Sequence, residues 1–251
     1  MTELSRGKPC SYGTGGRSVH SRPDAAYSAA RRLSPCLVVA AFILAVVAVF
    51  VGPAGRSFAA EKTIKIVALG DSLTAGYGLP NQDAFPTQLE RALRAKGIAV
   101  EITNAGVSGD TASGGLSRLD WSVPDGTDAV IVALGANDML RGVDPAVTRA
   151  ALDSILQRLK QRRIEVLFAG MQSARNMGTE YRGAYDSIFP DLATKHGVVF
   201  YPFLLEGIAA QTKFSLADGI HPNAAGVSQI VTGILPKAEE LIARVRSRRA
   251  S

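Results

Sequence analysis

The sequence predicts an α/β fold in which a five-stranded parallel sheet lies between two layers of helices, a three-layer α/β/α sandwich. Strand-like and helix-like segments alternate along residues 60–251, the order expected when helices connect parallel strands. The strand-like segment at residues 129–134 is apolar and β-branched without alternation, which indicates burial on both faces. No repeat or linker divides residues 60–251, so we expect one domain.

The predicted strands are short apolar segments, and glycine or proline ends several of them. Gly70 and Gly106 come at or just after the ends of the first two, and Pro202 ends the last. The five segments are residues 64–69, 100–104, 129–134, 165–169 and 198–201.

The predicted helices carry start signals, stop signals or an apolar face. Pro86 suits the first turn of one helix, and Gly97 follows as a stop. In the segment that begins at Pro145, apolar residues recur every four positions and form one face. The helical segments are residues 85–96, 111–119, 145–162, 182–196 and 224–246.

Composition and charge exclude several classes of protein. Hydrophobic residues make up 47% of the 251 residues and charged residues 20%, which excludes a disordered chain, a collagen and a coiled coil. The net charge of +6 would suit a nucleic-acid binder, but seven of the 28 basic residues and only two of the 22 acidic ones precede residue 60. The remainder is nearly neutral, so we expect no nucleic-acid partner. An arginine cluster at residues 244–249 is interpreted as a solvated helix end.

Residues 1–59 are predicted to be a disordered leader and signal peptide. An arginine pair precedes the apolar segment 37–51, and small residues occupy positions −3 and −1 of a cut after Ala59. This pattern predicts export to the periplasm or the medium. The alternative is an uncleaved anchor, for which the apolar segment is short, since a membrane span needs roughly 20 residues. Membrane contact is expected only through an uncleaved leader.

Both cysteines, Cys10 and Cys36, lie in the predicted leader. The predicted domain therefore has no disulfide, no thiolate zinc site and no cysteine nucleophile. Histidine spacing typical of a zinc site is also missing, so we expect no metal.

Polar, glycine-containing segments occur where a parallel sheet binds its ligands, at the carboxyl ends of the strands. Three of them directly follow predicted strands, and a fourth precedes the last helix. They are residues 70–73, 106–110, 135–138 and 218–222. Segments that are far apart in the sequence can therefore meet at one edge of the sheet.

Ser72 is the candidate nucleophile. It follows a buried strand where a helix is expected to start, and free N–H groups at a helix start suit developing negative charge. An ordinary N-cap serine is the structural alternative. Ser108, Ser113 and Ser117 lack this placement and are interpreted as structural.

His221 is the candidate base, because a serine hydroxyl reacts only beside one. Asp218 precedes it by three residues in a turn that can bring the carboxylate to one imidazole nitrogen, leaving the other nitrogen to take a proton. A purely local hydrogen bond is the alternative. His196 is interpreted as a partner of its helix C-terminus.

Gly109 and Asn137 are the candidate donors to an oxyanion. Gly109 can present a backbone N–H without a side chain in the way, and Asn137 supplies an amide. Each also fits an ordinary turn. The coincidence of nucleophile, base, acid and donors in strand-end loops favours acyl transfer.

These four blocks resemble those of the GDSL, or SGNH, hydrolase family, in its order and spacing. They are Gly70-Asp71-Ser72-Leu73, Gly109, Gly135-Ala136-Asn137-Asp138 and Asp218-Gly219-Ile220-His221-Pro222. Over residues 62–245 the chain is similar to the periplasmic thioesterase I, lysophospholipase and arylesterase branch of that family. The resemblance implies a flavodoxin-like sheet and no metal or organic cofactor.

The resemblance also implies roles. Ser72 would attack an ester or thioester carbonyl, His221 would act as base and then acid, and Asp218 would orient His221. The oxyanion would be held by the Ser72 and Gly109 N–H groups and the Asn137 amide, and Asp71 would shape the nucleophile turn. Residues 139–144 would contact the acyl chain.

We therefore expect a serine esterase for short to medium acyl esters, including aryl esters and lysophospholipids, with thioesters as second substrates. A carbohydrate acetyl-esterase and a non-catalytic binding module on the same fold are the alternatives. An α/β-hydrolase is disfavoured because Thr74 replaces the second glycine of Gly-x-Ser-x-Gly. A nucleotide binder is disfavoured because no phosphate-binding loop occurs.

Overall fold

The computed structural model describes residues 62–251 and has the predicted α/β fold. All five strands are parallel and are ordered β2-β1-β3-β4-β5. Their bounds are β1 (Ile64–Gly70), β2 (Val100–Gly106), β3 (Ala129–Ala133), β4 (Glu165–Ala169) and β5 (Val199–Tyr201). The predicted leader and the cut after Ala59 lie outside the described residues.

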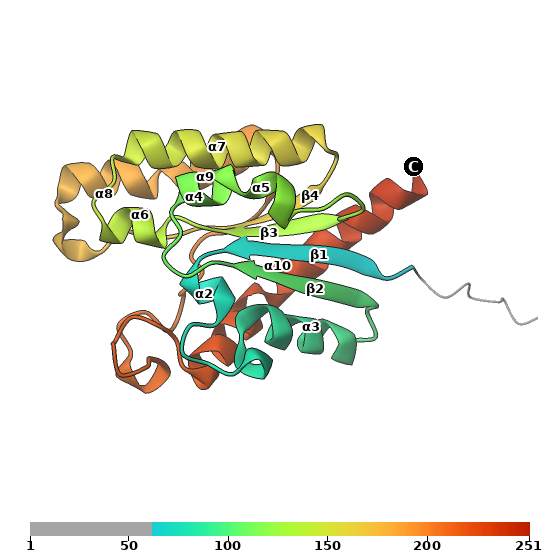
Figure 1. The fold of residues 1–251 in the computed structure, drawn as a ribbon, viewed down its shortest axis with the longest axis horizontal. Helices are drawn as coiled ribbons and strands as arrows, with labels where there is room; N and C mark the ends of the chain where they lie inside the picture. Colours follow the sequence, from blue (N-terminus) through green and yellow to red (C-terminus); the bar gives the residue numbers. More distant parts are fainter. Residues whose placement is uncertain (1–61) are drawn as a thin grey trace, which may run out of the picture. The chain divides into compact units, whose positions relative to one another are not determined.

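Helices cover both faces of the sheet and give the predicted three layers (Figure 1). One layer holds α3 and α10, which pack against each other, and the other holds α4, α5, α7 and α9. In chain order the helices are α2 (Ser72–Ala75), η1 (Asn81–Asp83), α3 (Phe85–Ala95), α4 (Ala112–Ser117), α5 (Leu119–Ser122), α6 (Ala136–Leu140), α7 (Pro145–Gln161), η2 (Arg175–Met177), α8 (Thr179–Asp186), α9 (Ile188–His196), η3 (Thr212–Phe214) and α10 (Ala224–Ala250). Within residues 62–251 there is no helix of the length and apolarity needed to cross a membrane.

The core explains why the strand segments are uninterrupted apolar runs. Every residue of β3 is buried, as expected for the central strand of a sheet covered on both faces. β1 is equally buried except at Lys65. The five strand predictions are confirmed to within two residues at each end.

The segment predicted as a single helix over residues 182–196 forms two helices, α8 and α9, which meet at Ser187. Pro190 explains the break, because a proline has no N–H to donate to the carbonyl four residues earlier and its ring clashes with that carbonyl. Proline is tolerated in a first helical turn, so α9 starts anew at Ile188.

The C-terminal arginines are not a solvated helix end, as the sequence had suggested. Arg249 Nη2 lies 2.7 Å from Asp128 Oδ2, and its Nη1 donates to the Lys62 carbonyl at 2.7 Å. Arg248 donates to the Asp128 and Arg163 carbonyls. These contacts tie the end of α10 to the amino ends of the strands and account for a helix that continues to Ala250.

Two glycines let α2 lie directly on the carboxyl ends of β1 and β2. A Cβ atom on Gly106 would lie 2.2 Å from the Ala75 nitrogen, and one on Gly70 would lie 2.0 Å from Thr74 Oγ1. Neither space can hold a side chain. The glycines therefore set how closely Ser72, the first residue of α2, approaches the strand ends.

Candidate active site

Ser72 is the first residue of α2, and its N-cap is Asp71 rather than Ser72 itself. The Asp71 carboxylate accepts a hydrogen bond from the Leu73 N–H at 3.0 Å. The Ser72 hydroxyl is consequently not used in capping the helix, and its Oγ lies 3.0 Å from Nε2 of His221. The structural alternative for Ser72, a capping serine, is wrong.

Asp218 and His221 are held together by a closed turn. Asp218 Oδ1 accepts from the Ile220 and His221 N–H groups, both at 2.9 Å, and Oδ2 lies 2.6 Å from His221 Nδ1. Because an ionised carboxylate can only accept, Nδ1 carries the proton and Nε2 is left to accept one from Ser72. The same hydrogen bonds from His221 and Ile220 lower the pKa of Asp218 to about 2, so the carboxylate is charged at neutral pH.

Tyr77 contacts the imidazole from the side of α2. Its ring centroid lies 4.4 Å from that of His221, with the two planes tilted by 37°. Half of the tyrosine surface is exposed, so this ring restricts the movement of His221 without enclosing it.

Asn137 reaches the same cavity as Ser72 and His221 from α6. Its Nδ2 donates to the Asp110 carbonyl at 3.0 Å, which leaves the second amide hydrogen for a ligand. Gly109 does not line the cavity. It precedes Asp110 and has a φ of +86°, a left-handed conformation that favours glycine. Within residues 62–251, the N–H groups of Ser72 and Gly109 have no acceptor.

Two arginines that the sequence analysis did not single out fix this region. Arg118 is buried and donates to the carbonyls of Gly70 and Ala105, both at 2.8 Å, and its Nε lies 2.5 Å from Asp110 Oδ2. Arg141 Nη2 donates to the Gly109 carbonyl at 2.7 Å and so orients that peptide. The only signal for Arg141 in the sequence is its position within residues 139–144, the segment expected to contact the acyl chain.

Asp138 anchors the helix that carries Asn137. Its side chain is fully buried and accepts from the Ala112 N–H at 2.8 Å and from Thr148 Oγ1 at 3.0 Å. Burial raises the pKa of Asp138 above its usual range. These bonds hold α6 against α4 and α7, and thus fix the backbone position of Asn137.

Asp71 is a buried carboxylate with one oxygen, Oδ2, that has no hydrogen-bond partner among the described residues. Burial raises its pKa from 3.8 to about 6, although the hydrogen bond from the Leu73 N–H and the electrostatic effect of the nearby His221 oppose the shift. The folded protein therefore binds a proton at Asp71 more tightly than the unfolded chain does. This contribution to stability is present below about pH 4 and is lost as the pH rises to about 6.

We expect Asp71→Asn to remove that pH dependence. The asparagine keeps an oxygen for the Leu73 N–H but cannot ionise, so the variant should gain stability relative to the wild type between pH 4 and pH 6. The gain should approach about 3 kcal/mol, since each pKa unit corresponds to about 1.4 kcal/mol. Urea unfolding of both proteins from pH 3.5 to 8 measures the difference. A constant difference across this range would contradict the assignment of a raised pKa to Asp71.

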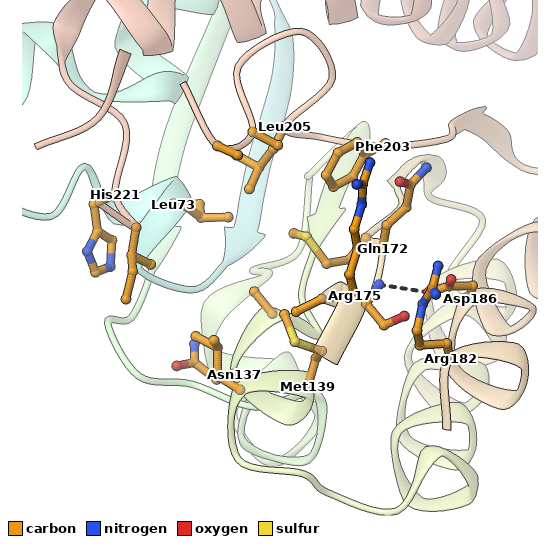
Figure 2. A pocket seen from close by; sticks show the side chains of 18 of the residues that line it. Leu73, Asn137, Met139, Gln172, Arg175, Arg182, Asp186, Phe203, Leu205 and His221 are labelled. Carbon is orange, nitrogen blue, oxygen red and sulfur yellow. Dashed lines mark hydrogen bonds between the residues drawn. The ribbon is translucent and has the colours of Figure 1, made fainter. Parts of the chain in front are cut away.

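A cavity of about 850 Å³ extends from Ser72 and His221, and its wall near them is largely apolar. Figure 2 shows His221 and Asn137 at one side of this cavity and Arg182 with Asp186 at the other. Of the loop expected to contact an acyl chain, Met139 and Leu140 line the cavity. The apolar residues of the wall include Leu73, Met139, Leu140, Met171, Phe203, Leu205 and Ile220.

His196, Ser108, Ser113 and Ser117 do not line the cavity. His196 is in the last turn of α9, as expected, but its Nε2 also lies 2.6 Å from Asp153 Oδ1 on α7. Ser117 donates to the Gly114 carbonyl, and Ser113 is exposed. In the part of the chain that the structure describes, no three His, Cys, Asp or Glu side chains are grouped as metal ligands would be.

The chain is similar in sequence and in structure to several known proteins. Residues 68–228 match the GDSL-like lipase/acylhydrolase family. The chain is 35% identical to an arylesterase of Vibrio mimicus over 66% of this chain and 84% of that protein. It is 36% identical to thioesterase 1/protease 1/lysophospholipase L1 of Escherichia coli K12 over 66% and 79%. Among solved structures, AlinE4, an SGNH-hydrolase family esterase, is 41% identical over 71% of this chain and 96% of that chain, with a TM-score of 0.61.

Proposed function

This chain belongs to the GDSL-like lipase/acylhydrolase family, and on that premise we propose that Ser72, His221 and Asp218 catalyse its hydrolysis of carboxylic esters. The observation that carries the proposal is the continuous relay from Ser72 Oγ to His221 Nε2 at 3.0 Å and from His221 Nδ1 to Asp218 at 2.6 Å. Nucleophile, base and orienting carboxylate are thus within hydrogen-bond reach of one another.

The reaction begins when Ser72 Oγ attacks the acyl carbon and gives its proton to His221 Nε2. Asp218 stabilises the imidazolium that forms. The bond to the leaving oxygen or sulfur then breaks, and His221 returns the proton to the leaving alcohol or thiol. Water attacks the acyl-enzyme with His221 again acting as base, and the carboxylic acid is released as Ser72 regains its hydrogen.

The oxyanion of each tetrahedral intermediate is assigned to the N–H groups of Ser72 and Gly109 and to the Asn137 amide. The assignment is supported by the two N–H groups that have no acceptor among the described residues and by the free hydrogen of the Asn137 amide. Arg141 would act as a positioning residue, because its bond to the Gly109 carbonyl holds in place the residue whose N–H is assigned to the oxyanion. Asp71 would fix the turn that presents Ser72.

The preferred substrates are short to medium acyl esters, including aryl esters and lysophospholipids, with thioesters as second substrates. The apolar wall beside Ser72 supports an acyl chain rather than a sugar. Export also favours esters, since an exported enzyme rarely meets acyl-CoA. We propose that residues 1–59 are the export leader and residues 60–251 the hydrolase domain; the mass of the mature N-terminus tests the cut after Ala59.

A chain-length series tests this substrate class. We expect the purified protein to hydrolyse p-nitrophenyl esters from acetate to octanoate, with kcat/KM highest at butyrate or longer because added methylenes bury against the apolar wall. The release of p-nitrophenol gives the rates, and acetylated xylo-oligosaccharides serve as the comparison. Activity confined to acetylated sugars would favour the alternative, a carbohydrate acetyl-esterase.

A further inference from the structure

The end of the cavity away from Ser72 carries an unpaired positive charge. Arg175, in η2, and Arg182, on α8, both line the cavity there (Figure 2). Neither side chain makes a hydrogen bond or an ion pair with any other residue between 62 and 251. We call these two residues the arginine pair.

Several arginines of this domain have acidic partners although they are partly exposed to solvent. Arg149 binds Asp191 at 3.0 Å, Arg158 binds Asp120 and Arg162 binds Asp125. Arg175 and Arg182 have no such partner among residues 62–251. Arg175 is exposed, whereas Arg182 is half-buried in the concave cavity wall, where an isolated charge loses part of its hydration.

Arg182 shows the cost of this arrangement. Its Nε atom is shielded from solvent and has no acceptor among the described residues. The nearest acidic group in the cavity wall, Asp186, uses Oδ1 to accept from the Ser173 N–H at 2.7 Å and forms no ion pair with Arg182. A buried donor without an acceptor is unfavourable, and an anion supplied by a ligand would remove that cost.

We propose that the arginine pair binds an anionic group, a carboxylate or a phosphate, on the far side of the ester substrate from the bond that is cleaved. The inference rests on the proposed function, since it places the reacting carbonyl at Ser72. The apolar residues between the two ends, Met139, Met171 and Phe203 among them, would contact an alkyl segment. The preferred substrate is then an amphiphilic ester with a charged end.

The anion can belong to either half of the ester, and two substrate pairs distinguish these sources. For the acyl half, the p-nitrophenyl ester of suberic acid is compared with the same ester capped as its methyl ester. For the alcohol half, 1-octanoylglycerol 3-phosphate is compared with 1-octanoylglycerol. We expect the anionic member of one pair to have a kcat/KM about tenfold higher, as a charged hydrogen bond allows.

Arg175→Gln, Arg182→Gln and the double variant should abolish that preference while changing kcat/KM for the neutral esters less than about twofold. Arg91→Gln is the matched control, because it removes the same charge from an exposed position on α3 that does not line the cavity. Circular dichroism and thermal unfolding verify that the variants are folded. An equal rate for charged and neutral members of both pairs in the wild type would overturn the proposal.

A binding measurement separates this proposal from the proposed function. In Ser72→Ala protein, calorimetric titration with the intact suberate ester and its capped counterpart reports affinity without turnover. Tighter binding of the anionic ester that depends on the arginine pair supports the subsite even if no ester is hydrolysed. Hydrolysis of neutral esters without any charge preference in rate or binding supports the proposed function and refutes the subsite.

Discussion

Ser72→Ala should lower kcat for p-nitrophenyl butyrate by about 10⁴- to 10⁶-fold while leaving the fold intact. The hydroxyl oxygen forms the covalent intermediate, and Ser72 is the one serine among residues 62–251 whose hydroxyl is hydrogen-bonded to His221. The loss should exceed that from removing a single oxyanion donor, which is typically about 10²- to 10³-fold. Steady-state rates of the purified variant measure it.

Two further variants test whether this loss of activity comes from the relay formed by Ser72, His221 and Asp218. Ser113→Ala changes an exposed serine on α4 and should retain wild-type rates. His221→Ala combined with Ser72→Ala should cost little more than Ser72→Ala alone, because the three residues act as a unit. Undiminished turnover by folded Ser72→Ala protein, or losses that multiply in the double variant, would show that another group performs the attack.

The positions of Ser72, Asp218 and His221 could be predicted from the sequence because they depend on local features. Ser72 follows directly on a buried strand, and Asp218 and His221 are three residues apart in one turn. Parallel strands have their carboxyl ends at one edge, so topology alone brought these segments close to each other. The bounds of α3 and α7 were also predicted to within a residue from local signals: Pro86 and Gly97 for α3, and Pro145 with an apolar face for α7.

Features that depend on long-range contacts could not be predicted. A buried Arg118 and a solvated arginine look alike in a sequence, and the difference lies in the carbonyls of Gly70 and Ala105, which other segments supply. The C-terminal arginines were misinterpreted because their partners, including Asp128, precede them by about 120 residues. The division of residues 182–196 into two helices is a different case, because its cause, Pro190, is a local signal within a segment that otherwise has a helical pattern.

Arg118 illustrates how much of the site depends on such contacts. Its guanidinium joins the end of β1 at Gly70, the end of β2 at Ala105 and the loop at Asp110, with Ser122 Oγ as a further acceptor at 2.9 Å. The Asp110 carbonyl in turn holds Asn137. A single buried cation therefore connects the strand that leads to Ser72 with the segment that orients the proposed oxyanion donors.

Arg118→Met should reduce the free energy of unfolding by about 3–5 kcal/mol. Methionine preserves most of the side-chain length, but it removes the Arg118 bonds to the Gly70 and Ala105 carbonyls and leaves the Asp110 carboxylate without its cation, although the Gly70 carbonyl still accepts from the Val107 N–H at 3.0 Å. Breaking a buried ion pair from one side has a cost of this size. Arg158→Met is the matched control: its partner Asp120 is mostly exposed, so the loss should be about 0–1 kcal/mol. Urea unfolding at pH 7 with a shared m-value compares the two. Equal losses would mean that Arg118 contributes no more than a surface ion pair, and that the strand ends are held together by the packing of α2 on Gly70 and Gly106 instead.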